Sequence, residues 1–246
     1  MNVFRYNDSS IACVEYVKTV LPHIGNISSF QVYFHDQDIP KQYRNVPDID
    51  VYDGKVHEME STYLFIAKNE KEDKELWLTG CTCGYGGTGP STTQEVLELL
   101  GVKIDYSRIY NEKKIILKEI TTHHDLNFIV YNPSTENPYR AGMKRFKVES
   151  LFEYPDQKWN AKEALKSLGV IKPLRSIEKK SNRFFSTKYS TDKEHFNYST
   201  NNGLVLGESW SKLDDDVMIN LIQDYINNYG GSYQVKKIEE NAWYNL

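Results

Sequence analysis

Residues 76–101 read LWLTGCTCGYGGTGPSTTQEVLELLG and join an apolar run, a glycine-rich loop and an amphipathic segment. The apolar and aromatic start is typical of a strand. Five glycines follow between positions 80 and 89. Pro90 suits the first turn of a helix that Ser91 or Thr92 caps. The order strand, loop, helix predicts a place where backbone N–H groups hold an anion.

The segments around this stretch favour antiparallel pairing. Residues 62–67 and 75–79 are apolar runs on either side of a charged loop, as in a β-hairpin. Further strands are expected over 29–35, 114–121, 127–131, 144–153, 203–207 and 232–238, and helices over 9–21, 92–100, 160–168 and 214–229. Strands clustered in hairpins with about four helices predict an α+β fold with a mainly antiparallel sheet.

The 246 residues allow one large domain or two small ones. An irregular basic stretch near 171–182 is the expected boundary. It separates an α+β domain over 1–170, which carries the glycine-rich segment, from a smaller α+β region over 171–246 that can also belong to the same domain. No apolar run approaches the roughly 20 residues that span a bilayer. With three cysteines and no secretory signal, the chain is expected to be cytoplasmic, without a membrane partner.

Charge is unevenly distributed along the chain. The net charge of −4 combines −7 over residues 1–139, +8 over 140–188 and −5 over 189–246. An acidic protein is not a general nucleic-acid binder, but its basic middle is suited to a phosphate or an acidic protein surface. Lys179, Lys180 and Arg183 lie there beside aromatic residues and are candidate ligands. The alternative is a basic surface that pairs with the protein's own acidic segments.

The glycine loop partly matches three known phosphate loops. Gly84, Gly86 and Gly89 have the spacing of a dinucleotide-binding fingerprint, with Asp105 in the place of its ribose-binding acid. The expected antiparallel strands count against that interpretation. A P-loop needs a lysine where Pro90 stands. A cysteine phosphatase loop needs an arginine where Gly89 stands, so both of these interpretations fail.

A more general anion-binding loop remains. Its N–H groups suit a phosphate, a carboxylate or an oxyanion. The candidate ligand-binding residues are Gly84, Tyr85, Gly86, Gly87, Thr88, Gly89 and Ser91. The alternative is a tight connection whose glycines serve geometry alone.

A cysteine in this loop raises the question of catalysis. Cys83 lies among N–H groups near a helix start, which would lower the pKa of its thiol. His124 and Asp125 supply a base and an orienting carboxylate, so a Cys–His–Asp hydrolase or transferase is the candidate catalytic arrangement. A buried cysteine and histidines in turns are the alternative. No residues have the spacing of a zinc or calcium site, so no metal is expected and no cofactor is assigned.

These features predict a cytoplasmic protein that binds a nucleotide or another phosphorylated small molecule. The glycine loop would take the phosphate, and the basic middle would add charge. Whether the protein is an enzyme stays open, because no acid, base or nucleophile stands out. The alternative is a non-enzymatic interaction protein, such as an inhibitor or immunity factor of bacterial or phage origin, with 18 tyrosines to build an interface.

Overall fold

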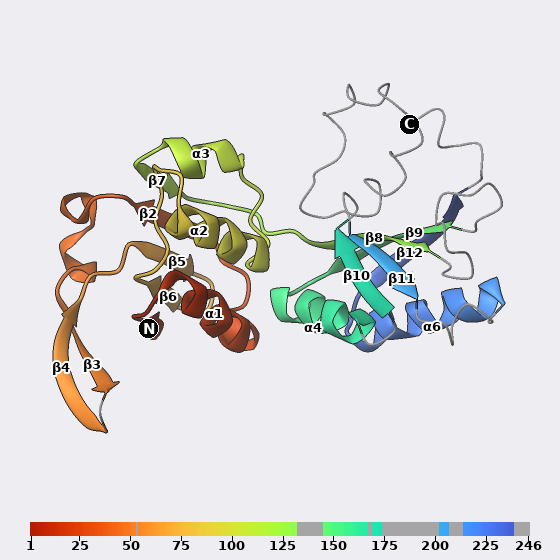
Figure 1. Ribbon diagram of the computed structural model, residues 1–246, viewed down its shortest axis with the longest axis horizontal. Coiled ribbons are helices and arrows are strands. Elements are labelled where there is room, and N and C mark those ends of the chain that lie inside the picture. Colours follow the sequence, from red (N-terminus) through yellow and green to blue (C-terminus); the bar gives the residue numbers. More distant parts are fainter. Residues whose placement is uncertain (53, 132–144, 167–168, 174–201, 207–213, 239–246) are drawn as a thin grey trace. The chain divides into compact units, whose positions relative to one another are not determined.

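The computed structural model describes residues 1–52, 54–131, 145–166, 169–173, 202–206 and 214–238 (Figure 1). The chain forms two units, Met1–His123 with Tyr154–Asp156, and His124–Glu153 with Gln157–Leu246. Each combines helices with mainly antiparallel strands, which confirms the α+β fold. The division falls at residue 123, whereas residue 171, near which the sequence suggested a boundary, lies in a strand of the second unit.

A five-stranded sheet forms the centre of the first unit, in the order β1-β6-β5-β2-β7. Its strands are β1 (Asn2–Tyr6), β2 (Ser29–Tyr33), β5 (Phe65–Asn69), β6 (Lys74–Leu78) and β7 (Lys114–Leu117). β5 and β6 form the predicted antiparallel hairpin, and β1 runs parallel to β6. β6 and β7 are not neighbours, so the helices between them do not complete the βαβ unit of a dinucleotide-binding fold.

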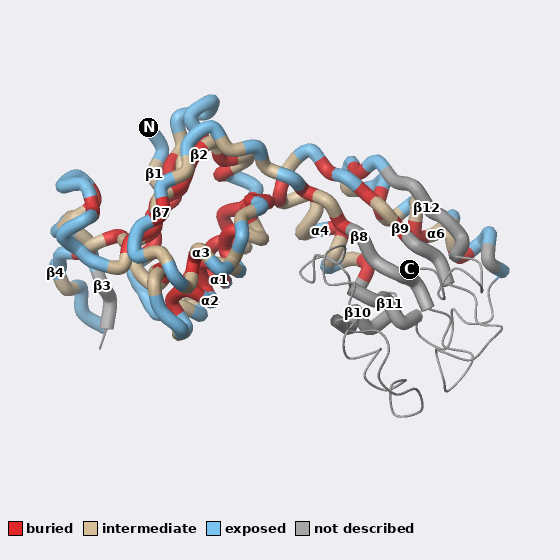
Figure 2. The backbone as a smooth tube through the Cα atoms, turned by 90° about the horizontal axis from the view of Figure 1, so that it is seen from above, coloured by how far each residue is buried: buried red, intermediate tan, exposed pale blue. Residues whose placement is uncertain are grey.

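Three helices cover one face of this sheet: α1 (Ser10–Ile24), α2 (Thr88–Leu99) and α3 (Tyr106–Asn111) (Figure 1). Alternate strand residues point to this face. In Figure 2 the buried stretches lie on the strands and on the helices that cover them. The fully buried apolar residues of these elements include Cys13, Val17, Leu21, Ile24, Phe30, Val32, Phe65, Leu76, Leu78, Val96 and Leu97. Their spacing of three to four residues in the helices gives each an apolar stripe toward the sheet.

The helix after the glycine loop begins earlier than the sequence suggests. Gly87 is the N-cap residue of α2 and Thr88 is its first residue. Pro90 lies in the first turn, as expected. The prediction that Ser91 or Thr92 caps the helix is wrong, because Ser91 N donates to the Gly87 carbonyl at 3.3 Å and Thr92 is buried within the helix.

The opposite face of the sheet is partly covered by residues 36–46, which include the short 3-10 helices η1 (Asp36–Asp38) and η2 (Lys41–Tyr43). No helix or strand was expected here from the sequence. A second hydrophobic core forms on this face from Tyr33, Ile39, Tyr43, Tyr63, Ile66 and Trp77. Ile39 and Tyr43 therefore hold an otherwise irregular segment against the sheet.

A separate two-stranded ribbon consists of β3 (Val46–Tyr52) and β4 (Lys55–Ser61). It projects from the first unit in Figure 1. Neither strand was expected from the sequence, because the segment is too rich in charged residues and contains Pro47.

The second unit is built on the sheet β10-β11-β8-β9-β12. Its strands are β8 (His124–Tyr131), β9 (Arg145–Phe152), β10 (Gly169–Pro173), β11 (Asn202–Leu206) and β12 (Ser232–Ile238). The helices α4 (Pro155–Lys166) and α6 (Asp215–Asn228) join it in one core, which contains Leu126, Val148, Phe152, Ala161, Leu165, Met218, Ile222 and Ile226. Among the helices that the structure describes, none has the length and apolarity to cross a membrane.

Candidate functional site

Packing accounts for most of the glycines in the loop. A side chain at Gly80 would lie 2.9 Å from Cys13 Sγ, and one at Gly84 would lie 2.9 Å from Lys113 Cα. Gly84 also has φ of +84°, which favours glycine. Side chains at Gly87 and Gly89 would collide with Tyr85 and Thr82. Gly86 is the exception in this loop, with no atom within 4 Å of the position of a side chain.

The first turn of α2 has N–H groups that packing does not explain. Gly84 N donates to the Ile109 carbonyl at 2.7 Å, and Ser91 N is bonded within the turn. In the part of the chain that the structure describes, the N–H groups of Thr88 and Gly89 have no acceptor, and Gly87 brings no capping side chain. The start of a helix carries partial positive charge. This turn therefore has two N–H donors without an acceptor, one at the exposed residue Thr88 and one at the buried residue Gly89, next to the exposed residue Gly86.

Aromatic and basic side chains form a chain of contacts that starts at Tyr85, which packs against this turn. The Tyr85 ring meets the edge of Phe34 with centroids 5.6 Å apart, and Phe34 meets His35 at 4.6 Å. Lys113 Nζ lies 4.9 Å from the centre of the Phe34 ring. These groups come from the end of β2 and the start of β7, so the sheet brings them to the glycine loop from about 50 and 30 residues away in sequence.

Sequence reasoning missed Phe34, His35 and Lys113 as site residues. An aromatic–histidine pair at the end of an expected strand was visible, but nothing in the local pattern indicates that β2 ends and β7 begins near the loop. That neighbourhood depends on strand order, with β2 between β5 and β7.

Tyr85 forms one wall of the site. Its ring is packed against Gly87, and its hydroxyl accepts a hydrogen bond from Thr82 Oγ1 at 3.1 Å. The residue remains 39% exposed. The glycines at 87 and 89 are therefore needed to seat this ring at the helix start, and the ring still offers surface to a ligand.

The predicted nucleophile Cys83 has the opposite environment from the one expected. Its thiol is buried and lies 3.6 Å from the Val32 carbonyl. Burial, together with the negative charge of Glu112, raises the pKa of this thiol to about 12. A thiolate is the reactive form of cysteine, so this environment gives no support to nucleophilic chemistry at neutral pH.

The predicted base and its orienting carboxylate belong to the other unit. His124 is buried and opens β8, and Asp125 follows it in the same strand. Consecutive strand residues project to opposite faces of a sheet. Asp125 and His124 are therefore directed away from each other, and Cys83 lies in the first unit.

The remaining sequence candidates are distributed as follows. Lys179, Lys180 and Arg183 lie outside the described residues. Asp105, the acid of the dinucleotide fingerprint, is the N-cap of α3, and its side chain accepts from Ser107 N at 2.9 Å. Asp105 therefore has a structural role at a helix start.

Two other kinds of site are not supported: an anion site along α2 and a metal site. A hollow of about 280 Å³ along α2 is lined by Ser91, Gln94, Glu95 and Glu98, and the carboxylates of the two glutamates repel phosphate. Within the described ranges, no group of histidine, cysteine and acidic side chains is arranged to hold a metal ion.

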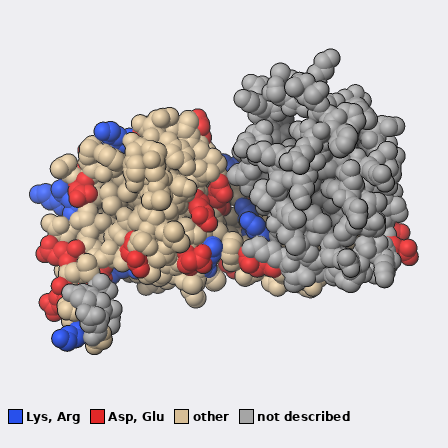
Figure 3. Space-filling model, viewed as in Figure 1, with Lys and Arg blue, Asp and Glu red and all other residues tan. Residues whose placement is uncertain are grey.

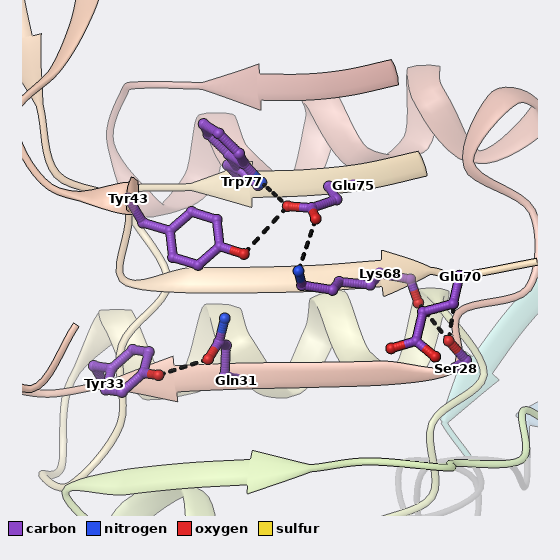
Figure 4. Close-up of polar contacts among 8 residues, drawn as sticks. All are labelled: Ser28, Gln31, Tyr33, Tyr43, Lys68, Glu70, Glu75 and Trp77. Atoms are coloured by element: carbon purple, nitrogen blue, oxygen red, sulfur yellow. Dashed lines mark hydrogen bonds and ion pairs between the residues drawn. The ribbon is translucent and has the colours of Figure 1, made fainter. Parts of the chain in front are cut away.

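A polar cluster on the other face of the first sheet surrounds Glu75 (Figure 4). Lys68 Nζ lies 2.7 Å from Glu75 Oε1, and Trp77 Nε1 and Tyr43 Oη donate to Oε2 at 2.7 and 3.4 Å. Both oxygens of the carboxylate are thus engaged. This cluster stabilises the sheet and leaves little of the carboxylate for a ligand.

Protein-family models, curated protein sequences and solved structures were compared with the chain, and none of them matches. A functional assignment must therefore come from the geometry of the molecule. The first turn of α2, with Tyr85 against it and Phe34 and Lys113 linked to Tyr85, is the part of the described structure that best combines unbonded N–H groups, charge and aromatic surface.

Proposed function

We propose that this protein binds a nucleotide or another phosphorylated small molecule at the first turn of α2. The observation that carries the proposal is the pair of N–H groups at Thr88 and Gly89, which have no acceptor in the described residues. Phosphate oxygens accept from such groups at helix starts in many proteins. The protein is proposed to act in the cytoplasm, since its three cysteines are all free thiols.

The side chains near the turn favour a nucleotide, which carries both a phosphate and an aromatic base. Lys113 is exposed and adds a positive charge over the Phe34 ring, which in turn contacts Tyr85. Phe34 and Tyr85 offer ring surface on which a base can stack. The phosphate would then lie at the helix start and the base at the ring pair. Lys179, Lys180 and Arg183 are proposed to add to the positive charge that attracts the ligand.

A thermal-shift screen tests this proposal directly. The panel is AMP, ATP, NAD, a sugar phosphate and inorganic phosphate, each at millimolar concentration. A bound ligand raises the melting temperature because it stabilises the folded state alone. At least one nucleotide should raise it, and flat melting curves across the panel would overturn the proposal.

Two substitutions at one position separate binding from folding. Thr88→Pro removes the N–H donor at the first helical position, where proline is well tolerated, and Gly87 before it is extended, as proline requires. Thr88→Ala keeps the N–H and removes the hydroxyl. The ligand shift should survive in T88A and be lost in T88P, while both variants melt near the wild type without ligand.

A further inference from the structure

The β3–β4 ribbon has exposed apolar side chains on one face. Ile49 is 64% exposed and Val56 is 68% exposed. Ile49 is paired with Glu58, and Pro47 with Glu60. Cross-strand partners lie on the same face of a ribbon, as do residues two apart along a strand. Ile49, Val56, Glu58 and Glu60 therefore share a face on which acidic groups flank apolar ones.

The base of the ribbon is fixed to the first unit. Tyr63 Oη and Ser61 Oγ both donate to Asp48 Oδ2, at 2.7 and 3.0 Å. Asn7 Nδ2 in turn donates to Ser61 Oγ at 2.8 Å. An isolated two-stranded ribbon is marginally stable in water. This network at the base therefore presents a preformed arm, whose free end stands away from the sheet (Figure 1).

The ribbon is strongly acidic. Residues 46–61 contain five acidic side chains and one lysine, a net charge of −4 within 16 residues. Figure 3 shows acidic side chains along the ribbon. In the described part of the chain, the carboxylates of Glu58 and Glu60 have no hydrogen bond or ion pair beyond the backbone pairing of the two strands. Their charges are therefore available to a partner.

The charge selects the class of partner. Nucleic acids and anionic lipid surfaces are negative and would be repelled. A second copy docked ribbon to ribbon would bring two acidic faces together, which is also unfavourable. A protein surface with an apolar groove between lysines and arginines complements both the apolar and the acidic side chains.

We infer that the β3–β4 ribbon is a docking arm for a protein partner that has an apolar groove rimmed by Lys and Arg. The apolar side chains of Ile49 and Val56 enter the groove, and Glu58 and Glu60 pair with its basic rim. This role is independent of the ligand proposed at α2, because it uses none of the same residues.

Photo-crosslinking in the cells that produce the protein identifies the partner. Benzoylphenylalanine replaces Val56 in the full chain, and a matched control places it at Ile11 of α1, an equally exposed apolar position. The inference requires an adduct from position 56 that position 11 does not form, with the crosslink on a surface rich in Lys and Arg. No adduct, equal adducts from both positions, or an adduct with nucleic acid, an acidic surface or a second copy would overturn it.

Charge reversal tests the contact with the purified partner. Glu58→Lys with Glu60→Lys should raise the Kd at least tenfold, and this loss of affinity should become smaller as salt is added. The control is Glu70→Lys with Glu95→Lys, which changes the net charge equally at two exposed positions outside the ribbon. It should alter the Kd less than twofold. Equal effects of the two double variants, at unchanged melting temperatures, would contradict the inference.

Discussion

Lys68 Nζ lies 2.7 Å from Glu75 Oε1 across the β5–β6 hairpin, where the two residues are register partners. Burial alone would lower the pKa of Lys68, but its interactions with Glu75 and Tyr43 together outweigh this and raise that pKa. Tyr43 and Trp77 donate to the other oxygen of Glu75. The charged pair is thus held on a largely buried sheet face, where each partner depends on the other.

Replacing Lys68 by Met should destabilise the fold by about 3 kcal/mol, because it leaves the carboxylate of Glu75 buried without its cation. Lys68→Met with Glu75→Gln should recover much of that loss, since Trp77 and Tyr43 can still donate to the amide oxygen. Urea unfolding of the two variants gives both values. A double variant that is less stable than the single one would contradict this interpretation of the pair.

The hydrogen bond from Tyr63 to Asp48 should make stability depend on pH. Burial opposes ionisation of Asp48, but hydrogen bonds from Tyr63, Ile49 N and Ser61 outweigh it and lower the pKa of this carboxyl. The unfolded chain then binds a proton more readily, so the contribution is present above the unfolded pKa of about 4 and disappears as the pH falls through the folded value. Asp48→Asn should flatten this part of the stability profile, measured by urea unfolding between pH 5 and pH 2. An unchanged profile would show that Asp48 is not one of the groups responsible.

Alanine substitutions should separate the packed glycines from the open one. Gly89→Ala places a methyl group 2.6 Å from the Tyr85 hydroxyl and against Thr82 Oγ1, so it should cost about 2 kcal/mol. Gly86→Ala meets nothing within 4 Å and should change stability by less than about 0.5 kcal/mol. Thermal unfolding distinguishes the two, and equal losses would be inconsistent with this loop conformation.

The three thiols should be inert in the native protein. Cys13, Cys81 and Cys83 are all buried, which keeps a reagent from reaching them; burial also raises the pKa of Cys81 and Cys83, whereas the hydrogen bond with Cys81 lowers that of Cys13. An aromatic disulfide reagent at pH 8 should therefore react with no thiol within minutes, and with all three in denaturant. Rapid modification of one thiol in the folded protein would contradict this expectation and indicate a reactive cysteine.

Local sequence patterns predicted much of the fold. The apolar runs around a charged loop predicted the β5–β6 hairpin, and the helix expected over 214–229 corresponds to α6, which buries Met218, Ile222 and Ile226. β3 and β4 could not be found in this way, because their pattern is mostly charged and exposed. The network of Asp48, Ser61 and Tyr63 supports their base, and it joins residues 13 and 15 positions apart in sequence.

The candidate site was predicted in part. The glycine pattern located the loop, but it did not distinguish glycines that seat Tyr85 from glycines that face a ligand. Phe34 and Lys113 reach the loop through strand order, which no local pattern encodes. The thiol of Cys83 was expected near the helix start, and the alternation of buried positions instead places it in the core.

The most direct measurement is an amide nitrogen–proton correlation spectrum of the full chain during titration with the nucleotide that gives the largest thermal shift. A ligand held by the first turn of α2 should move the Thr88 and Gly89 amide signals in a saturable manner, with Gly86 and Tyr85 following. The T88P variant should show no saturable change at Gly89. Signals of this turn that stay in place while others move, or that stay in place throughout, would contradict the central proposal.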